Sequence, residues 1–298
     1  GEAGIETKER VYLLDWMNTY KENQAKRGKK DGNQIEVTIR ILKDYAGERM
    51  LMEQIDKTFC QNYLDYLQSE YRSRGKRVSN YTLHTYYRVL NGALNAAVRA
   101  EIIKSNPFTK ISNSEKIRLP ESKRSYMTIE EVRALIATPM KNEAVKDAYL
   151  FSCFCGLRIS DIIKLQWKDV FVDRGQYRLS VSMQKTKEPI YLPLSSEALK
   201  WMPARGDKTP DDYVFDLPSP TMVNLLIKPW AKAAGISKRF TFHTARHTFA
   251  TMMLTLGADL YTTSKLLGHA DVKMTQVCAK IINQKKDDAV NLVNGMFD

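Results

Sequence analysis

The sequence lacks the features that define several classes of protein. Its 298 residues contain four cysteines, Cys60, Cys153, Cys155 and Cys278, at spacings that match neither a zinc pattern nor a disulfide framework. No apolar run approaches the roughly 20 residues that a membrane helix needs. The first ten residues are polar and charged, unlike a secretory signal. We therefore expect a cytoplasmic protein with reduced thiols and no contact with a membrane.

Charge, by contrast, is abundant and unbalanced. The chain carries 46 Lys and Arg against 34 Asp and Glu, a net charge of +12. Residues 1–126 hold 23 basic against 16 acidic side chains, and residues 127–298 hold 23 against 18. Because both halves share the excess, it predicts a basic surface along the whole molecule. Nucleic acid is the leading partner, since phosphate contacts supply most non-specific affinity. The alternative is a protein that has a basic surface and no nucleic-acid partner.

Apolar periodicity predicts a helical first domain over residues 1–107. Apolar residues recur there at the three-to-four spacing of four helices. Asp56 and Ser79 stand where N-caps are expected, and Asn106-Pro107 stops the last helix. Residues 108–126 show no periodicity and contain a proline among charges, which is typical of an interdomain linker.

Residues 127–298 are predicted to form a second, mixed domain. A capping box, Thr128 to Glu131, opens its first helix. Tyr177–Met183 and Pro189–Leu194 alternate apolar and polar residues, which predicts an antiparallel hairpin. The remainder has helical spacing. The fold class we expect is therefore mainly α with a small antiparallel β-sheet.

Four short segments of the second domain carry residues suited to phosphate chemistry. Arg158 follows Gly156 at the start of an expected helix, where exposed backbone amides and a guanidinium can together hold a phosphate. Lys185 and Lys187 lie at the predicted hairpin turn, from which a lysine can reach into a groove. A solvated turn lysine is the alternative.

The third and fourth segments hold three of the four histidines. His243 and Arg246 share a helix face at i and i+3. His243 and His247 have a zinc spacing, but Thr244 stands where the metalloprotease motif needs glutamate, so we expect no metal. His269 follows a glycine that ends a helix, and a C-terminal cap is its alternative role. The clustering of histidines favours a site.

In their order and spacing, these segments resemble the signature of the tyrosine recombinases, also called phage-type integrases. The matching residues are Gly156-Leu157-Arg158, Lys185-Thr186, His243 with Arg246-His247, and Leu267-Gly268-His269. The resemblance covers nearly the whole chain. It implies an N-terminal helical core-binding, SAM-like domain followed by an α+β catalytic domain. The form most resembles integrases of mobile elements from Bacteroides-type bacteria.

The resemblance implies phosphoryl transfer from DNA to an enzyme hydroxyl, through a covalent 3′-phosphotyrosyl intermediate and without metal, ATP or another cofactor. Charge builds on the phosphate oxygens in the transition state, so fixed cations are needed. Arg158 and Arg246 match the arginines that clamp the non-bridging oxygens, a bidentate task suited to guanidinium. Lys185 matches the lysine that protonates the leaving 5′ oxygen, with Lys187 as the adjacent alternative.

The same resemblance implies roles for the remaining site residues. His243 matches the histidine that assists proton transfer, and His269 matches the group that hydrogen-bonds the phosphate. Asp161, three residues after Arg158, stands where the family often has a supporting acidic residue, and a solvated helix residue is the alternative. His247 is expected to be structural or supporting.

Position 278 departs from the family pattern. The nucleophilic tyrosine is expected nine residues after His269, where this chain has Cys278, and no tyrosine follows Tyr261. A thiol, with a reference pKa of about 8.5, ionises more readily than a phenol at about 10. Its sulfur lies roughly 4–5 Å nearer the backbone, however, and a misplacement of ~1 Å can cost ~10²-fold in rate. We expect weak or no strand cleavage with DNA binding retained. Cysteine at position 278 is compatible both with an engineered replacement of the tyrosine and with a natural variant.

The resemblance implies two partners: a double-stranded DNA recombination site, and further copies of the chain that form a dimer to a tetramer on DNA. Accessory DNA-bending proteins are a further possible partner.

Residues 285–298 are expected to form a short helix with one apolar face. In the family such a tail docks on a neighbouring protomer, and covering its own domain is the alternative. The candidate phosphate contacts lie on a basic turn and the linker: Arg72, Arg74, Lys76, Arg77, Lys123 and Arg124.

Two other functions compete with recombination. A type IB-like topoisomerase would share the phosphoryl chemistry and relax supercoils without joining two sites. A non-catalytic DNA-binding or architectural protein would explain Cys278. The intact set of Arg158, Lys185, His243, Arg246 and His269 favours an enzyme.

Overall fold

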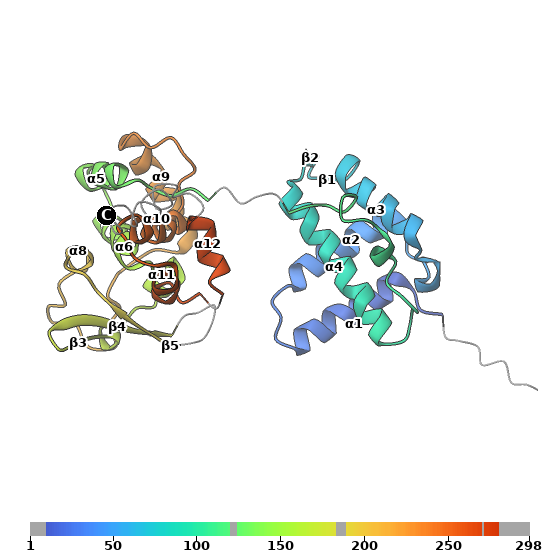
Figure 1. Cartoon of the computed structure of the whole chain (residues 1–298), viewed down its shortest axis with the longest axis horizontal. Coiled ribbons are helices and arrows are strands. Elements are labelled where there is room, and N and C mark those ends of the chain that lie inside the picture. Colours follow the sequence, from blue (N-terminus) through green and yellow to red (C-terminus); the bar gives the residue numbers. More distant parts are fainter. Residues whose placement is uncertain (1–9, 120–123, 183–188, 270, 280–298) are drawn as a thin grey trace, which may run out of the picture. The chain divides into compact units, whose positions relative to one another are not determined.

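The computed structural model describes residues 10–119, 124–182, 189–269 and 271–279. The chain divides into two units, Gly1–Glu121 and Ser122–Asp298, each with its own hydrophobic core (Figure 1). Within the described ranges, no helix combines the length and apolar character needed to span a bilayer. The predicted class, mainly α with small antiparallel sheets, is confirmed.

Four helices build the first unit: α1 (Leu13–Lys26), α2 (Gly32–Ala46), α3 (Lys57–Ser69) and α4 (Asn80–Arg99). The predicted caps form, because the Asp56 carboxylate accepts the Phe59 N–H at 2.7 Å and the Ser79 hydroxyl accepts that of Thr82 at 3.4 Å. Trp16 donates its indole N–H to the Ala93 carbonyl, which ties α1 to α4. A 3₁₀ turn, Met52–Gln54, lies between α2 and α3.

The structure differs from the predicted linker over residues 108–117. A 3₁₀ turn, Pro107–Lys110, follows α4, and Phe108, Ile111 and Ile117 are buried in the first core. Asn106 fixes this segment, since its amide donates to the side-chain oxygens of Asn91 and Asn95. Periodicity does not predict this burial, because an irregular segment without helical spacing can bury apolar side chains as well as a helix does.

The basic turn of the first unit is a small hairpin. Strands β1 (Arg72–Ser73) and β2 (Lys76–Arg77) pair antiparallel. Arg74 and Gly75 connect them with φ of 50° and 75°, the left-handed conformation that a two-residue hairpin turn requires. Arg74, Lys76 and Arg77 are exposed, whereas Arg72 is half-buried. The hairpin therefore presents three cations to solvent.

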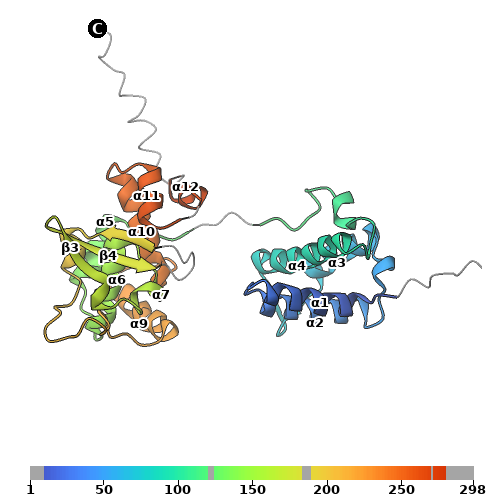
Figure 2. The ribbon, with the colours of Figure 1, turned by 90° about the horizontal axis from the view of Figure 1, so that it is seen from below.

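In its described residues, the second unit combines helices with a three-stranded sheet, part of which is labelled in Figure 2. Strands β3 (Val170–Asp173), β4 (Gln176–Ser182) and β5 (Pro189–Pro193) are antiparallel, in the order β3-β4-β5. The predicted capping box forms at Thr128 and Glu131. A 3₁₀ turn, Trp167–Asp169, precedes β3. The helices are α5 (Ile129–Ala137), α6 (Glu143–Cys155), α7 (Ile159–Ile162), α8 (Ser196–Leu199), α9 (Pro220–Ala233), α10 (Phe242–Thr255), α11 (Leu260–Leu266) and α12 (Lys273–Ala279).

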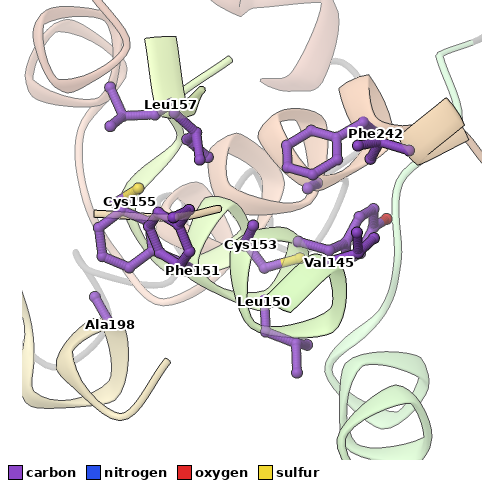
Figure 3. Packing of buried hydrophobic residues seen from close by; sticks show 14 of the residues in the cluster. Val145, Leu150, Phe151, Cys153, Cys155, Leu157, Ala198 and Phe242 are labelled. Carbon is purple, nitrogen blue, oxygen red and sulfur yellow. The ribbon is translucent and has the colours of Figure 1, made fainter. Parts of the chain in front are cut away.

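Helix α6 is the centre of the second core (Figure 3). Its side chains are buried on nearly every face, as expected for a helix that is apolar all round. Tyr149 stacks on Phe240 with ring centroids 4.8 Å apart and meets Trp230 and Phe242 edge-on. Helix α10 packs along α6. The core thus fixes α10, which carries three of the predicted site residues.

Gly156 ends α6 in the left-handed conformation, with φ of 77°. A Cβ at this position would lie 2.6 Å from Phe249 Cδ1 and 3.0 Å from Leu267 Cδ2. The segment that carries Arg158 can therefore approach α10 closely only because residue 156 has no side chain.

Gly156→Ala is expected to lower the free energy of unfolding of the second unit by about 2–4 kcal/mol, as the sum of backbone strain and overpacking. Gly175→Ala is the matched control, because Gly175 has φ of 76° and no atom within 4 Å of its added Cβ. The Gly175→Ala control is expected to lower the free energy of unfolding by about 1 kcal/mol. Urea unfolding of both variants measures the difference. If both variants lost the same free energy of unfolding, the close packing described around Gly156 would be contradicted.

Candidate active site

Arg246 joins three separate segments of the second unit. It lies on α10 and is 3% exposed. One guanidinium nitrogen, Nη1, donates to the Gly156 carbonyl at 2.7 Å, and Nη2 donates to the Leu267 carbonyl. The turn after α6 and the turn after α11 are therefore both fixed to α10. These bonds involve two nitrogens of a group with five N–H donors, so the side chain retains capacity for an anion.

Arg158 stands at the N-cap position of α7, one residue before the first helical turn that the sequence predicted for it. Its Nη1 lies 3.9 Å from Oδ2 of Asp161, which is buried. Burial lowers the pKa of Arg158, and the Asp161 carboxylate opposes that effect. The structure thus brings Asp161 against Arg158.

The two arginines lie close enough to influence each other. Burial, followed by the charge of Arg158, lowers the pKa of Arg246 to about 9, and Asp161, Cys155 and Cys278 oppose the shift. The Arg246 guanidinium consequently stays protonated at neutral pH. Two cations in partly desolvated surroundings near one carboxylate form a positive site that suits a phosphate group.

The three histidines of the second unit occupy different environments. His243 is exposed in the first turn of α10, and His247 is half-buried one turn later, with ring centroids 4.6 Å apart. Burial, helped by the charges of His243, Arg124, Arg246 and His269, lowers the pKa of His247 to about 3. His247 is therefore neutral under ordinary conditions, as a structural or hydrogen-bonding residue would be.

His269 is oriented by helix α12. Its Nδ1 and the hydroxyl of Thr275 are hydrogen-bonded at 2.7 Å, and Thr275 is fully buried. The bond fixes the ring with Nδ1 toward α12. No motif in the sequence marks Thr275 as this partner, because it lies six residues from His269 across a turn. Within the described ranges, no group of three or more His, Cys, Asp or Glu side chains is placed to hold a metal ion.

Cys278 lies on α12 and is 3% exposed. It packs with Phe249 and Leu254 of α10 and with Leu267. Burial raises the pKa of its thiol, while the charges of Arg124 and Arg246 and the hydroxyl of Thr251 lower it. The structure thus brings residue 278 into the surroundings of Arg246. The thiol is mainly protonated at neutral pH, since the net shift is upward from an already weakly acidic group.

Several predicted residues lie outside the part of the chain that the structure describes. These are Lys185, Lys187, Lys123 and the tail 285–298. Arg124 is described and is half-buried in the second unit. A groove of about 970 Å³ in this unit lies between α9 and the turn before α6 and includes Met140, Pro229 and Trp230. None of the predicted catalytic residues lines it.

His247 should not titrate between pH 8 and pH 5, because its pKa is lowered to about 3. Proton-carbon NMR of the histidine rings measures this, with His247→Gln identifying the signal. Since the unfolded value is about 6.5, protonation favours unfolding, so stability is lost as the pH falls from about 6.5 toward 3. A His247 signal with a midpoint near pH 6.5 would contradict the burial described here.

Comparison with known proteins agrees with the motifs. Residues 125–283 match the model of the phage integrase family, and residues 12–117 match the phage integrase SAM-like domain. A tyrosine recombinase of Pseudothermotoga lettingae is 32% identical over 211 residues, covering 68% of this chain and 71% of that protein. Another, of Thermosipho africanus, is 28% identical and covers 93% of this chain and 95% of its own length.

Solved structures share the fold. The Tn1549 transposon integrase in complex with a circular intermediate DNA has a TM-score of 0.68 and 18% identity, covering 88% of this chain and 94% of that one. A lambda integrase dimer bound to a COC′ core site has a TM-score of 0.66 and 20% identity, covering 90% and 95%. The family indicated by the motifs is confirmed: the chain belongs to the phage integrase family of tyrosine recombinases.

Proposed function

We propose that this chain is a site-specific DNA recombinase of the integrase type, in a form that is defective in strand cleavage. The observation that supports the proposal is that buried Arg246 is bonded to the segments that carry Arg158 and His269 and lies in the surroundings of Cys278. Its relatives are named tyrosine recombinases, and the solved integrases that share its fold are bound to DNA.

The reaction that we propose is the one that the resemblance to the family implies, and the charges of the site are compatible with it. Arg158 and Arg246 bind the non-bridging oxygens of the scissile phosphate and stabilise the charge that builds there during attack. The nucleophile at position 278 forms a bond to phosphorus as the bond to the 5′ oxygen breaks. Lys185 donates a proton to that oxygen, and His243 assists the transfer. Attack by a 5′ hydroxyl of another strand then reverses the steps and releases the enzyme.

The residue at position 278 sets the limit on this chemistry. Cys278 is packed among apolar side chains, and its burial raises the thiol pKa. A short, protonated side chain is poorly placed to reach a phosphate beside Arg158. Cysteine at the nucleophile position therefore predicts a chain that binds its DNA site and cleaves it weakly. An architectural DNA-binding role is the competing function that the same burial favours.

The proposal includes the wider features of the family. Solved lambda integrase forms a dimer on a core site and a tetramer on a Holliday junction, and we extend dimer-to-tetramer assembly to this chain. The likeness to a transposon integrase supports a role in a mobile element. A Bacteroides-type source, accessory DNA-bending proteins and phosphate contacts from the hairpin Arg72–Arg77 and from Lys123 stay predictions.

A covalent-adduct assay tests the proposed function. Duplexes selected from a random pool by binding to this chain are nicked and mixed with the chain, with Cys278→Tyr and with Cys278→Phe. We expect Cys278→Tyr to form an adduct at least about 10²-fold faster than the parent, because its hydroxyl reaches the phosphate. Cys278→Phe controls for the larger ring and should form none.

If the parent chain forms adducts as fast as Cys278→Tyr, cysteine is a competent nucleophile and the cleavage defect is refuted. If circular dichroism shows that all three proteins are folded and none forms an adduct on DNA that each binds, the architectural function replaces recombination.

Deletion of residues 287–298 tests the role proposed for the tail. We expect binding to a single half-site to stay within about twofold, while assembly on a full site falls by at least tenfold, since a docking segment contributes to contacts between protomers. Gel shifts on half and full sites measure both. An equal loss on the two DNAs would show that the tail stabilises its own domain instead.

A further inference from the structure

Helix α12 carries a threonine whose hydroxyl bonds to a side chain outside its own helix. Other helical threonines of this chain, such as Thr38, Thr248 and Thr263, donate their hydroxyl proton to the backbone carbonyl four residues earlier. Thr275 stands in the first turn of α12, but its hydroxyl meets Nδ1 of His269 at 2.7 Å. The Thr275 hydroxyl is therefore directed toward a predicted site residue.

The backbone at His269 is held independently of this bond. The His269 N–H donates to the Ser264 carbonyl at 3.0 Å, and the Leu267 carbonyl accepts from buried Arg246. These bonds fix where the backbone of the turn lies, but they do not fix the rotation of the imidazole ring. The Thr275 hydroxyl supplies a restraint on that rotation.

The direction of the hydrogen bond follows from the burial of Thr275. This residue is 0% exposed, and within the described residues Nδ1 of His269 is the hydrogen-bond partner of its hydroxyl. A threonine hydroxyl has a single proton, which would be buried without an acceptor if the hydroxyl only accepted from the ring. The hydroxyl therefore donates to Nδ1. A neutral imidazole whose Nδ1 is an acceptor carries its proton on Nε2.

The position of this proton decides how the ring meets a phosphate. Phosphate oxygens accept hydrogen bonds, so a neutral histidine can bond to one only through the nitrogen that carries the proton. With the proton on Nδ1, the lone pair of Nε2 would repel an anion. Thr275 also stands three residues before Cys278 on α12, so the ring of His269 and residue 278 depend on the same helix.

We propose that Thr275 is a positioning residue of the active site: its hydroxyl donates to Nδ1 of His269, restrains the ring and keeps the ring proton on Nε2, the nitrogen that donates to the scissile phosphate. This rests on the proposed function in so far as His269 binds the phosphate. Thr275 acts through His269 and is not itself a catalytic residue.

Nitrogen-15 NMR of the full chain, labelled at histidine, tests the tautomer without DNA. Correlations between ring protons and ring nitrogens at about pH 8 show which nitrogen carries the proton, and His269→Gln identifies the signal. We expect the proton on Nε2. In Thr275→Val the Nδ1 resonance should move downfield, toward that of an acceptor without a donor, and Thr275→Ser should restore it. A proton on Nδ1, or an Nδ1 resonance that Thr275→Val leaves unchanged, would overturn the proposal.

Thr263→Val is the matched control. Thr263 is also 0% exposed, and its hydroxyl donates to the Asp259 carbonyl at 2.9 Å. This substitution removes one buried hydroxyl from α11 and should leave the His269 resonances unchanged. An equal movement of Nδ1 in Thr263→Val and Thr275→Val would contradict a specific bond. The tautomer of the parent chain is measured without any substitution of Thr275, so it decides the proposal even if Thr275→Val does not fold.

Substitutions in the Cys278→Tyr background connect Thr275 to catalysis. At saturating nicked DNA, Thr275→Val should slow adduct formation by at least about tenfold and Thr275→Ser by no more than about threefold, because only serine retains the donor that holds the ring. Packing alone predicts the reverse order, since valine keeps the shape of threonine and serine loses its methyl group.

The reverse order, or equal rates in the two variants, would refute the positioning role. If Cys278→Tyr forms no adduct at all, the recombinase function fails, while the NMR result still decides whether Thr275 sets the tautomer of His269.

Discussion

A single buried guanidinium holds the candidate site together. Arg246 is bonded to the carbonyls of Gly156 and Leu267, which lie 90 and 21 residues away from it in the chain. Only a planar side chain with several donors can connect two carbonyls and still present N–H groups to an anion, so lysine is not an equivalent. Removal of this charge would therefore disturb the geometry of the site as well as its electrostatics.

The remaining parts of the site depend on that geometry. Because the turn after α6 is fixed, Arg158 and Asp161 lie beside Arg246. Because the turn after α11 is fixed, His269 meets Thr275, and α12 places Cys278 against α10. The same packing that organises the cations also buries the thiol. The positions of the two arginines and the burial of Cys278 thus have one structural origin.

Local signals predicted the elements and the polar motifs well. Asp56, Ser79 and Thr128 cap helices because their side chains bond to backbone three residues away, a pattern visible in sequence. The resemblance implies that Arg158, Arg246 and His269 share one site, and this stays a prediction. In the structure Arg158 lies near Asp161, and Arg246 is bonded to the carbonyl of Leu267, two residues before His269. Burial of Phe108 and Ile117 could not be read from periodicity, since they pack from irregular backbone.

The contacts that sequence could not reveal join distant segments. Thr251 lies against Cys278, and Met127 is bonded to Thr248, although each pair is separated by a long stretch of chain. No periodic pattern encodes such pairs, because they depend on how α10, α12 and the linker pack. The same applies to Arg124, which is half-buried in the second unit and whose contact with phosphate stays a prediction.

A crystal structure of this chain bound to a duplex from the selection would test the central claim most directly. The account predicts that one backbone phosphate accepts hydrogen bonds from both Arg158 and Arg246, while Arg246 keeps its bonds to Gly156 and Leu267. The sulfur of Cys278 should face the same phosphorus from beyond bonding distance. A complex in which the phosphates contact only the outer basic surface, with the two arginines sealed from DNA, would contradict the account.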